Sequence, residues 1–361
     1  YLGSWGYGLL EFTDGVRTNH YTSENSSLEL TTFGNDWIGI GGLDFDANNN
    51  LWVTNSSAAS VVSVRKNNGE WKAYNLGSVA TGVDVGKIMV DKQGLKWLMV
   101  RAHALIVFND NNTLDDTTDD QAKRLTSSAG NGALPGTTVL SMASDRDGQV
   151  WIGSDAGVSV FYSPANIFSN QNFDAQRILI EQDGYGQYLL EAEAVTAIAI
   201  DGSNRKWFGT DRAGVFLMSA DGTEQILHFT EENSPLLSNS ITDITIAESG
   251  EVFFGTANGI ISYRSESVPP QATLDEVVVF PNPVRENYAG SIAIRGLVED
   301  SSVKITDISG TLVYSTMGEG GQALWNGCNF NGEKVKTGVY LVYVTNSDGS
   351  KTAVTKIMFV K

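Results

Sequence analysis

A sequence unit that returns at intervals of 45 to 56 residues constrains the fold of this chain more than any other feature. The unit is clearest over residues 145–161, which read as a turn, a strand opened by Trp151, a second turn at Gly157 and another strand. A chain that repeats one supersecondary unit builds an array, because each unit buries its faces against its neighbours. The position of Trp151 is taken by an aromatic residue in every unit: Tyr1, Trp52, Trp97, Trp151, Trp207 and Phe253.

Each unit after the first, which starts at Tyr1, carries a turn before this marker aromatic residue. Gly or Asn stands three residues before the marker, and Asp stands six before it in four units, with Ala247 in the last. Because Asp side chains bond backbone groups two residues on, and Gly and Asn accept a positive φ, this turn joins two strands of a hairpin. The apolar runs around it give four short strands per unit, A to D, of which D is the weakest.

Four strands per unit predict the blades of a β-propeller rather than a helical solenoid. Six blades are marked and seven are possible; closing the ring requires the two ends to share a blade, or residues upstream. We expect the marker residues to fill the gaps between neighbouring blades, each removing roughly 150–250 Å² from water. The propeller is assigned to residues 1–268.

A different pattern follows the repeats. Residues 269–275 form a linker, which Pro269 and Pro270 keep extended. Residues 276–361 lack the repeat and contain seven runs of strand length between turns. Short strands at this spacing predict an immunoglobulin-like β-sandwich. The expected fold is therefore all-β, a propeller followed by an immunoglobulin-like sandwich.

Composition narrows the function. The 24 Lys and Arg against 42 Asp and Glu give a net charge of −18, which argues against nucleic-acid binding because no surplus of cations is present to displace counterions from phosphates. A single cysteine, Cys328, allows no intrachain disulfide. The sequence contains no run of 18 or more apolar residues, the length that a membrane-spanning helix needs. The chain begins at Tyr1 without a signal peptide, so we expect a trimmed form or a piece of a longer protein.

Residues typical of catalysis and metal binding are present but not in the required patterns. His20, His103 and His228 have no Cys or Glu at ligand spacing. The oxygen-rich stretch 109–120 lacks the spacing and the glycine of a calcium loop, which favours a solvated loop between strands C and D. The aromatic, glycine-rich stretch 183–188 could stack on sugar rings, but an inserted loop is the favoured interpretation. We expect no enzyme activity, no catalytic residue, no metal and no cofactor.

Two parts of the chain resemble known families. The repeat resembles the two-component-regulator propeller repeat, in which Asp-x-x-Gly precedes Trp, Gly-Thr and a second Gly. The Trp151 and Trp207 units match this pattern best, whereas the Trp52 and Trp97 units depart from it after the Trp. The tail resembles the C-terminal sorting domain of the type IX secretion system of Gram-negative bacteria. Its motif residues are Pro281, Asn282, Pro283, Asp307, Gly310, Trp325, Gly327, Gly338, Tyr340 and Lys356.

The resemblance implies a function at the cell surface. Proteins with such tails cross the outer membrane through the secretion machinery, and most are then attached to surface lipopolysaccharide. A regulator-type propeller followed by this tail is the arrangement of PorZ-like components of that system, which implies partners in the machinery and binding of lipopolysaccharide or another glycan. The implied location is the outer-membrane-associated cell surface, with the periplasm as the alternative. Two other functions stay open: a surface-attached glycan-binding cargo protein, and a periplasmic oligosaccharide-sensing propeller related to hybrid two-component sensors.

Overall fold

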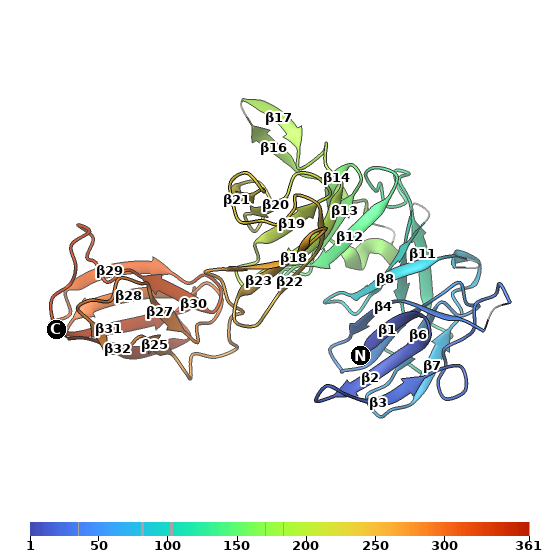
Figure 1. Cartoon of the computed structure of the whole chain (residues 1–361), viewed down its shortest axis with the longest axis horizontal. Helices are drawn as coiled ribbons and strands as arrows, with labels where there is room; N and C mark the ends of the chain where they lie inside the picture. The colour runs from blue at the N-terminus through green and yellow to red at the C-terminus, as the bar shows by residue number, and fades with distance from the viewer. Residues whose placement is uncertain (35, 81–82, 102–103, 170, 183, 361) are drawn as a thin grey trace. The chain divides into compact units, whose positions relative to one another are not determined.

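The computed structural model describes the chain except for residues 35, 81–82, 102–103, 170, 183 and 361 (Figure 1). The fold is all-β, a β-propeller followed by a β-sandwich, as the repeat and the tail predict. Short 3₁₀ helices, η1 (Gly77–Val79) and η2 (Pro164–Phe168), lie between strands. Contacts divide the chain into two compact units, which we describe separately: Tyr1–Ile198 with Gly209–Ala213, and Ala199–Phe208 with Gly214–Lys361.

The first compact unit contains the sheets of the first four repeats. A seven-stranded sheet of order β3-β2-β1-β4-β5-β6-β7 holds two repeats, because the end of β1 pairs with the start of β4. The next two repeats form the sheets β11-β10-β9-β8 and β12-β13-β14-β15. The strands are β1 (Leu2–Gly6), β2 (Gly8–Thr13), β3 (Val16–Tyr21), β4 (Ile38–Phe45), β5 (Leu51–Ser56), β6 (Val62–Arg65), β7 (Trp71–Tyr74), β8 (Val85–Val90), β9 (Lys96–Val100), β10 (Ala104–Asn109), β11 (Gln121–Leu125), β12 (Val139–Ser144), β13 (Val150–Ser154), β14 (Gly157–Phe161) and β15 (Gln176–Arg177).

Strand D of the Trp151 repeat differs from the prediction. The run 177–180 predicts this strand from its sequence, but β15 stops at Arg177 and β16 (Leu179–Gln182) pairs with β17 (Tyr185–Tyr188) in a separate hairpin. The two runs are close in sequence, so pairing with each other costs less loop entropy than pairing with the blade. The expected loop 183–188 is therefore mostly strand, drawn in light green in Figure 1, and Asp183 lies outside the described residues.

The remaining strands form two propeller sheets and the sandwich. The propeller sheets have the orders β18-β19-β20-β21 and β22-β23-β24. The sandwich packs the sheet β25-β27-β30 on the sheet β26-β32-β31-β28-β29. The strands are β18 (Val195–Ile200), β19 (Lys206–Thr210), β20 (Val215–Met218), β21 (Gln225–Phe229), β22 (Ile241–Ile246), β23 (Glu251–Thr256), β24 (Gly259–Arg264), β25 (Val278–Phe280), β26 (Val284–Arg285), β27 (Ile292–Arg295), β28 (Ser302–Asp307), β29 (Leu312–Met317), β30 (Gln322–Trp325), β31 (Gly338–Thr345) and β32 (Thr352–Val360).

A hydrogen bond joins the Asp and the Trp of the repeat. In the clearest unit, Oδ1 of Asp145 accepts from the backbone N–H groups of Asp147 and Gln149, while Oδ2 accepts from the indole Nε1 of Trp151 at 2.9 Å. The same indole bond joins Asp46 to Trp52 and Asp91 to Trp97. From the sequence, Asp is expected to serve the turn alone. The indole bond explains the six-residue spacing, and it explains why the last unit loses both partners together, with Ala247 and Phe253 in their places.

The marker residues fill the gaps between sheets in the middle units of the propeller but not in its first and last units. Four marker tryptophans are fully buried, and each of three contacts strand C of the next repeat: Trp52 with Phe108, Trp97 with Phe161 and Trp207 with Tyr263, at centroid distances of 6.2, 5.1 and 5.8 Å. Tyr1 is 40% exposed, because β1 joins the next repeat edge to edge in one sheet. Phe253 is half-buried; its neighbour Phe254 points inward instead and contacts Trp207.

Candidate functional site

The residues of the tail motif all lie in the sandwich, within the second compact unit. Strand β32 runs through the larger sheet between β31 and β26, antiparallel to the first and parallel to the second. This position brings the start of the domain, at 281–285, against its last strand. The buried core between the two sheets contains Ile305, Trp325, Val342 and Ile357. The motif is therefore assembled by the fold from segments more than 70 residues apart.

Asn282 of the Pro281-Asn282-Pro283 turn acts as a partner for the last strand. Its Nδ2 donates to the carbonyl oxygen of Lys356 at 2.9 Å, and its Oδ1 accepts from the backbone N–H of Met358 at 3.0 Å. The side chain thus makes the two bonds that a neighbouring strand would make. The peptide bonds before Pro281 and Pro283 are both cis. Strand β26 then continues the pairing, with Val284 opposite Phe359.

Asp307 organises the turn between β28 and β29. Its Oδ1 accepts from the backbone N–H groups of Ser309 and Thr311, each at 2.9 Å, and from the Ser309 hydroxyl at 2.6 Å. These bonds, first among them that from the Ser309 hydroxyl, lower the pKa of the Asp307 carboxyl. Gly310 completes the turn with φ of 89°, a conformation that L side chains rarely adopt. Both motif residues are explained by the turn.

Trp325 is the centre of the sandwich core. It is 1% exposed, its Nε1 donates to the carbonyl oxygen of Cys328 at 2.8 Å, and its ring contacts Phe359 at 5.5 Å. Gly327 has φ of 74°, and a Cβ there would come within 3.3 Å of the Phe359 ring. Tyr340 packs on the same two rings and donates its hydroxyl to the carbonyl oxygen of Lys336 at 2.9 Å. Burial raises the pKa of the Tyr340 hydroxyl.

Two motif residues have no such structural role. Gly338 has no positive φ, and a Cβ there would meet its nearest neighbour at 3.9 Å, so nothing in the structure requires glycine. The Lys356 side chain is exposed and points away from the core, while its backbone carbonyl serves the bond to Asn282. Its side chain is thus available to a partner.

Arg205 connects the propeller to the sandwich, and sequence analysis did not single it out. Its Nε donates to Oδ2 of Asp201 at 2.7 Å, the oxygen that bonds Trp in the other repeats. Its Nη2 donates to the Ser265 hydroxyl at 3.2 Å, and its Nη1 lies 3.6 Å from a carboxylate oxygen of Glu319 in the sandwich. The indole Nε1 of Trp207 consequently has no hydrogen-bond partner among the described residues. One blade turn has therefore exchanged its internal bond for a bond to the tail.

The linker segment is held between the two parts that it joins. The carbonyl oxygen of Val268 accepts from the N–H of Gly321 at 2.7 Å, and the N–H of Gln271 donates to the carbonyl oxygen of Leu297 at 2.8 Å. Glycines on both sides allow this approach: a Cβ on Gly202 or Gly320 would lie 2.0 or 2.3 Å from the Val268 oxygen. The extended path expected from Pro269 and Pro270 is thus bonded to the sandwich along its length.

Exposed aromatic side chains gather on the first compact unit, and we call them the aromatic surface. Trp5 is 45% exposed, contacts Trp37 edge-on at 5.4 Å and carries the guanidinium of Arg101 at 4.6 Å over its ring. Tyr7 is 72% exposed and stacks on His20 at 5.4 Å. Clustered exposed rings with adjoining charge are typical of a binding surface. The cluster is not visible in the sequence, because its aromatic members come from three separate segments.

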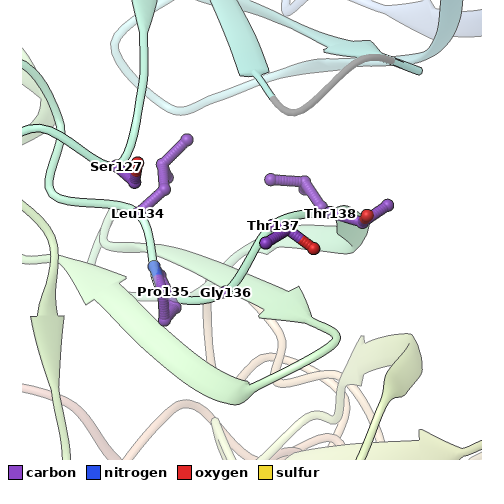
Figure 2. A pocket seen from close by; sticks show the side chains of 7 residues that line it. Ser127, Leu134, Pro135, Gly136, Thr137 and Thr138 are labelled. Atoms are coloured by element: carbon purple, nitrogen blue, oxygen red, sulfur yellow. The ribbon is translucent and has the colours of Figure 1, made fainter.

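A pocket of about 320 Å³ opens in the connection from β11 to β12. Figure 2 shows Ser127 and Leu134 on one side and Thr137 and Thr138 on the other. Asp155 fixes this connection: its carboxylate accepts from the backbone N–H groups of Thr137 and Thr138 at 2.8 and 3.0 Å. Burial opposes ionisation, but a hydrogen bond from the Thr137 hydroxyl, together with these backbone bonds, keeps the pKa of Asp155 below its usual value. The volume is at the low end for ligand pockets and the lining is neutral, so we assign the pocket no ligand.

The other sequence candidates are used within the fold. His228 stacks on Phe216 at 3.9 Å, and His103 lies outside the described residues. The acidic loop 109–120 does lie between strands C and D, and it is tied down by pairs such as Asp115 with Lys66 and the buried Asp110 with Lys96. Among the described residues, no three His, Cys, Asp or Glu side chains are grouped to hold a metal ion. No helix in that part of the chain is long and apolar enough to cross a membrane.

Comparisons with known proteins match both parts of the chain. Residues 278–360 match the family model described as the secretion system C-terminal sorting domain, and residues 133–156 match that of the two component regulator propeller. Among solved structures, PorZ of Porphyromonas gingivalis is 29% identical with a TM-score of 0.68, and it is described as an essential bacterial surface component of the type-IX secretion system. The match covers 99% of this chain and 50% of PorZ, so the chain spans about half the length of that relative.

More distant structures are also similar. The extracellular domain of a putative hybrid two component system from B. thetaiotaomicron is 16% identical with a TM-score of 0.45, over 89% of this chain and 55% of that one. No curated protein matches this chain.

Proposed function

We propose that this chain is a non-enzymatic, PorZ-like surface component of a type IX secretion system, exported to the outer-membrane-associated cell surface. The observation that carries the proposal is the extent of the likeness to PorZ: it runs through propeller and tail together, over 99% of the chain at 29% identity. A shared tail alone would fit any protein that carries a sorting domain. A shared propeller and tail in one order favour a component of the machinery over cargo.

The geometry suggests how the two parts work together. The motif residues other than Gly338 and Lys356 build the sandwich, so a partner would recognise the finished domain rather than an extended peptide. Arg205 and the bonded segment 265–271 join that domain to the neighbouring blade turn. In this proposal the tail docks the protein on the machinery, and the propeller acts as a recognition scaffold.

Deleting the gene separates a component of the machinery from cargo. A component of the machinery predicts that other proteins with sorting tails accumulate inside the cell envelope, whereas loss of one cargo protein leaves their export normal. Normal export and attachment of the other cargo would refute the proposal. Removing residues 276–361 from this protein is the companion test, and we expect it to abolish surface exposure in protease-shaving and fractionation assays. Fractionation also distinguishes the cell surface from the periplasm.

The aromatic surface favours a second activity, the binding of lipopolysaccharide or another glycan. Sugar rings present C–H faces that pack on exposed aromatic rings, and Trp5 and Tyr7 each leave much of a ring uncovered. The test is binding of the purified chain to lipopolysaccharide and to a glycan array. We expect Trp5→Ala to abolish binding and Tyr185→Ala to preserve it, because Tyr185 is 79% exposed but lies on the separate hairpin. Equal binding by both variants would exclude the aromatic surface.

A further inference from the structure

Along β31 and β32, the outer face of the larger sandwich sheet carries a group of apolar side chains where an antiparallel sheet normally carries polar residues. Along β31, Tyr340, Val342 and Val344 point into the core, so Val339, Leu341 and Tyr343 point outward. The register places outward residues of β32 beside them. Val339 lies opposite Met358, and Tyr343 lies opposite Val354. Four of these side chains are well exposed: Val339 37%, Tyr343 38%, Met358 48% and Val354 61%.

The charges on this face are all positive. Lys356 of β32 lies opposite Leu341 of β31, and Lys304 of β28 lies opposite Tyr343 of β31. On the described strands of this sheet, no outward position carries Asp or Glu. The contrast with the rest of the chain is sharp, because residues 276–361 contain eight Lys or Arg and eight Asp or Glu, which leaves the whole net charge of −18 in residues 1–275. We call the outward residues Lys304, Val339, Leu341, Tyr343, Val354, Lys356 and Met358 the tail face.

We propose that the tail face docks on a partner protein of the secretion machinery whose contact surface is flat, apolar at its centre and acidic around it. This inference rests on the proposed function and adds to it the surface and the chemistry of the partner. Charge complementarity selects the partner, since two lysines amid apolar side chains attract carboxylates and repel cations. An apolar centre with charged residues beside it is also the usual anatomy of a protein interface.

Two other occupants fit the tail face less well. A second copy of the same face would bring lysines against lysines, which costs free energy on association. A lipid surface takes an amphipathic element that sinks its apolar side below the headgroups. The tail face instead has Lys356 at its middle, on a rigid sheet that continues into Asn282 and the rest of the core. Both occupants remain outcomes of the test.

Photo-crosslinking at Tyr343 in the bacterium that encodes the chain tests the inference. The full-length protein carries benzoylphenylalanine at position 343, or as a control at Phe330, which is 61% exposed on the loop between β30 and β31. We expect a discrete adduct with a second protein at 343 and none at 330, with the joined peptide mapping to an apolar, acidic surface. The double variant Lys304→Glu with Lys356→Glu should lower the adduct yield at least about tenfold, the equivalent of 1.4 kcal/mol. Lys336→Glu, a charge reversal outside the tail face, should leave it unchanged.

Each contrary outcome is distinguishable. No adduct specific to 343, or an adduct unaffected by the double charge reversal in a variant that melts like the wild type, overturns the inference. An adduct with a second copy of the chain overturns it in favour of self-association. Sedimentation of the purified chain with vesicles of phosphatidylglycerol and phosphatidylcholine, lost in the double variant, overturns it in favour of a lipid surface. If instead the chain without residues 276–361 still reaches the surface, the proposed function itself fails.

Discussion

Replacing Arg205 by alanine separates the stability of the blade from the attachment of the tail. The guanidinium bonds Asp201 within the blade, Ser265 in the segment just before the linker and Glu319 in the sandwich. Removing it breaks all three contacts. It also frees Oδ2 of Asp201 to accept the Trp207 indole N–H, which has no partner in the described structure. The blade thus regains the bond of the other repeats, whereas the tail regains nothing.

The magnitudes follow from the burial of each group. The Asp201 side chain is 0% exposed, and losing its charged hydrogen bond costs roughly 1.5–3 kcal/mol. The ion pair with the half-exposed Glu319 adds at most about 1 kcal/mol. The new indole bond to the same carboxylate returns roughly 1.5–3 kcal/mol. Arg205→Ala should therefore lower the free energy of unfolding by only about 1 kcal/mol. Asp201→Ala also removes the turn bonds of Oδ1 and leaves the arginine uncompensated, which should cost roughly 3 kcal/mol or more.

Two measurements on each variant test this reasoning. Guanidinium unfolding followed by tryptophan fluorescence gives the free energy of unfolding. Limited proteolysis with mass spectrometry gives the cleavage rate in residues 265–275, which we expect to rise about fivefold in Arg205→Ala as roughly 1 kcal/mol of tethering is lost. Equal destabilisation by the two variants would show that Trp207 does not recover the bond. An unchanged cleavage rate would show that Arg205 does not hold the tail.

Three further predictions follow from the repeat and from the tail. Trp97→Phe should destabilise the protein by roughly 1–3 kcal/mol more than Trp207→Phe. Of these two tryptophans only Trp97 bonds its Asp, so its replacement leaves a buried carboxylate oxygen without that partner. Equal costs in denaturant unfolding would contradict this prediction. Asn282→Ala should speed hydrogen exchange at the amide of Met358, while Ser350→Ala, in the turn that precedes β32, serves as the control. Hydrogen bonds lower the pKa of Asp307 on folding, so its ionised form stabilises the sandwich above the unfolded pKa, and this contribution is lost as the pH falls through the folded pKa. Asp307→Asn should therefore make the loss of stability below about pH 4 less steep, and an unchanged acid limb would refute the role.

Sequence patterns recovered the features that rest on local chemistry. The turn at Asp145 and the turn at Asp307 each use bonds within four residues, so their residue types alone predict them. The alternation in β31 likewise predicts its two faces. The Asp–Trp bond was also within reach, because the six-residue spacing recurs and both residues vanish together at Ala247 and Phe253. The pattern alone, however, does not show that the Asp and Trp side chains bond each other.

Features that depend on distant partners were not predictable. Arg205 occupies a position at which other repeats carry Asn50, Leu95, Gln149 and Glu251, so nothing local shows that it bonds Glu319, more than 100 residues on. The exposure of Tyr1 depends on β1 joining β4 edge to edge, which no propensity encodes. The run 177–180 is predicted as one strand, but it is divided between β15, which pairs with β14, and β16, which pairs with β17, and local sequence does not decide between these partners.

The central position of β32 also sets the order in which the tail can fold. Of the eight sandwich strands, the one synthesised last lies inside the larger sheet and supplies Ile357 and Phe359 to the core. Until it emerges, Trp325 and Tyr340 lack the Phe359 ring that packs on both of them, and Asn282 has no backbone to bond. Propeller repeats, whose contacts are closer in sequence, can fold while synthesis continues, whereas the sandwich must wait. The sandwich therefore folds late. A factor that binds the unfolded tail can do so at any time before β32 has been synthesised.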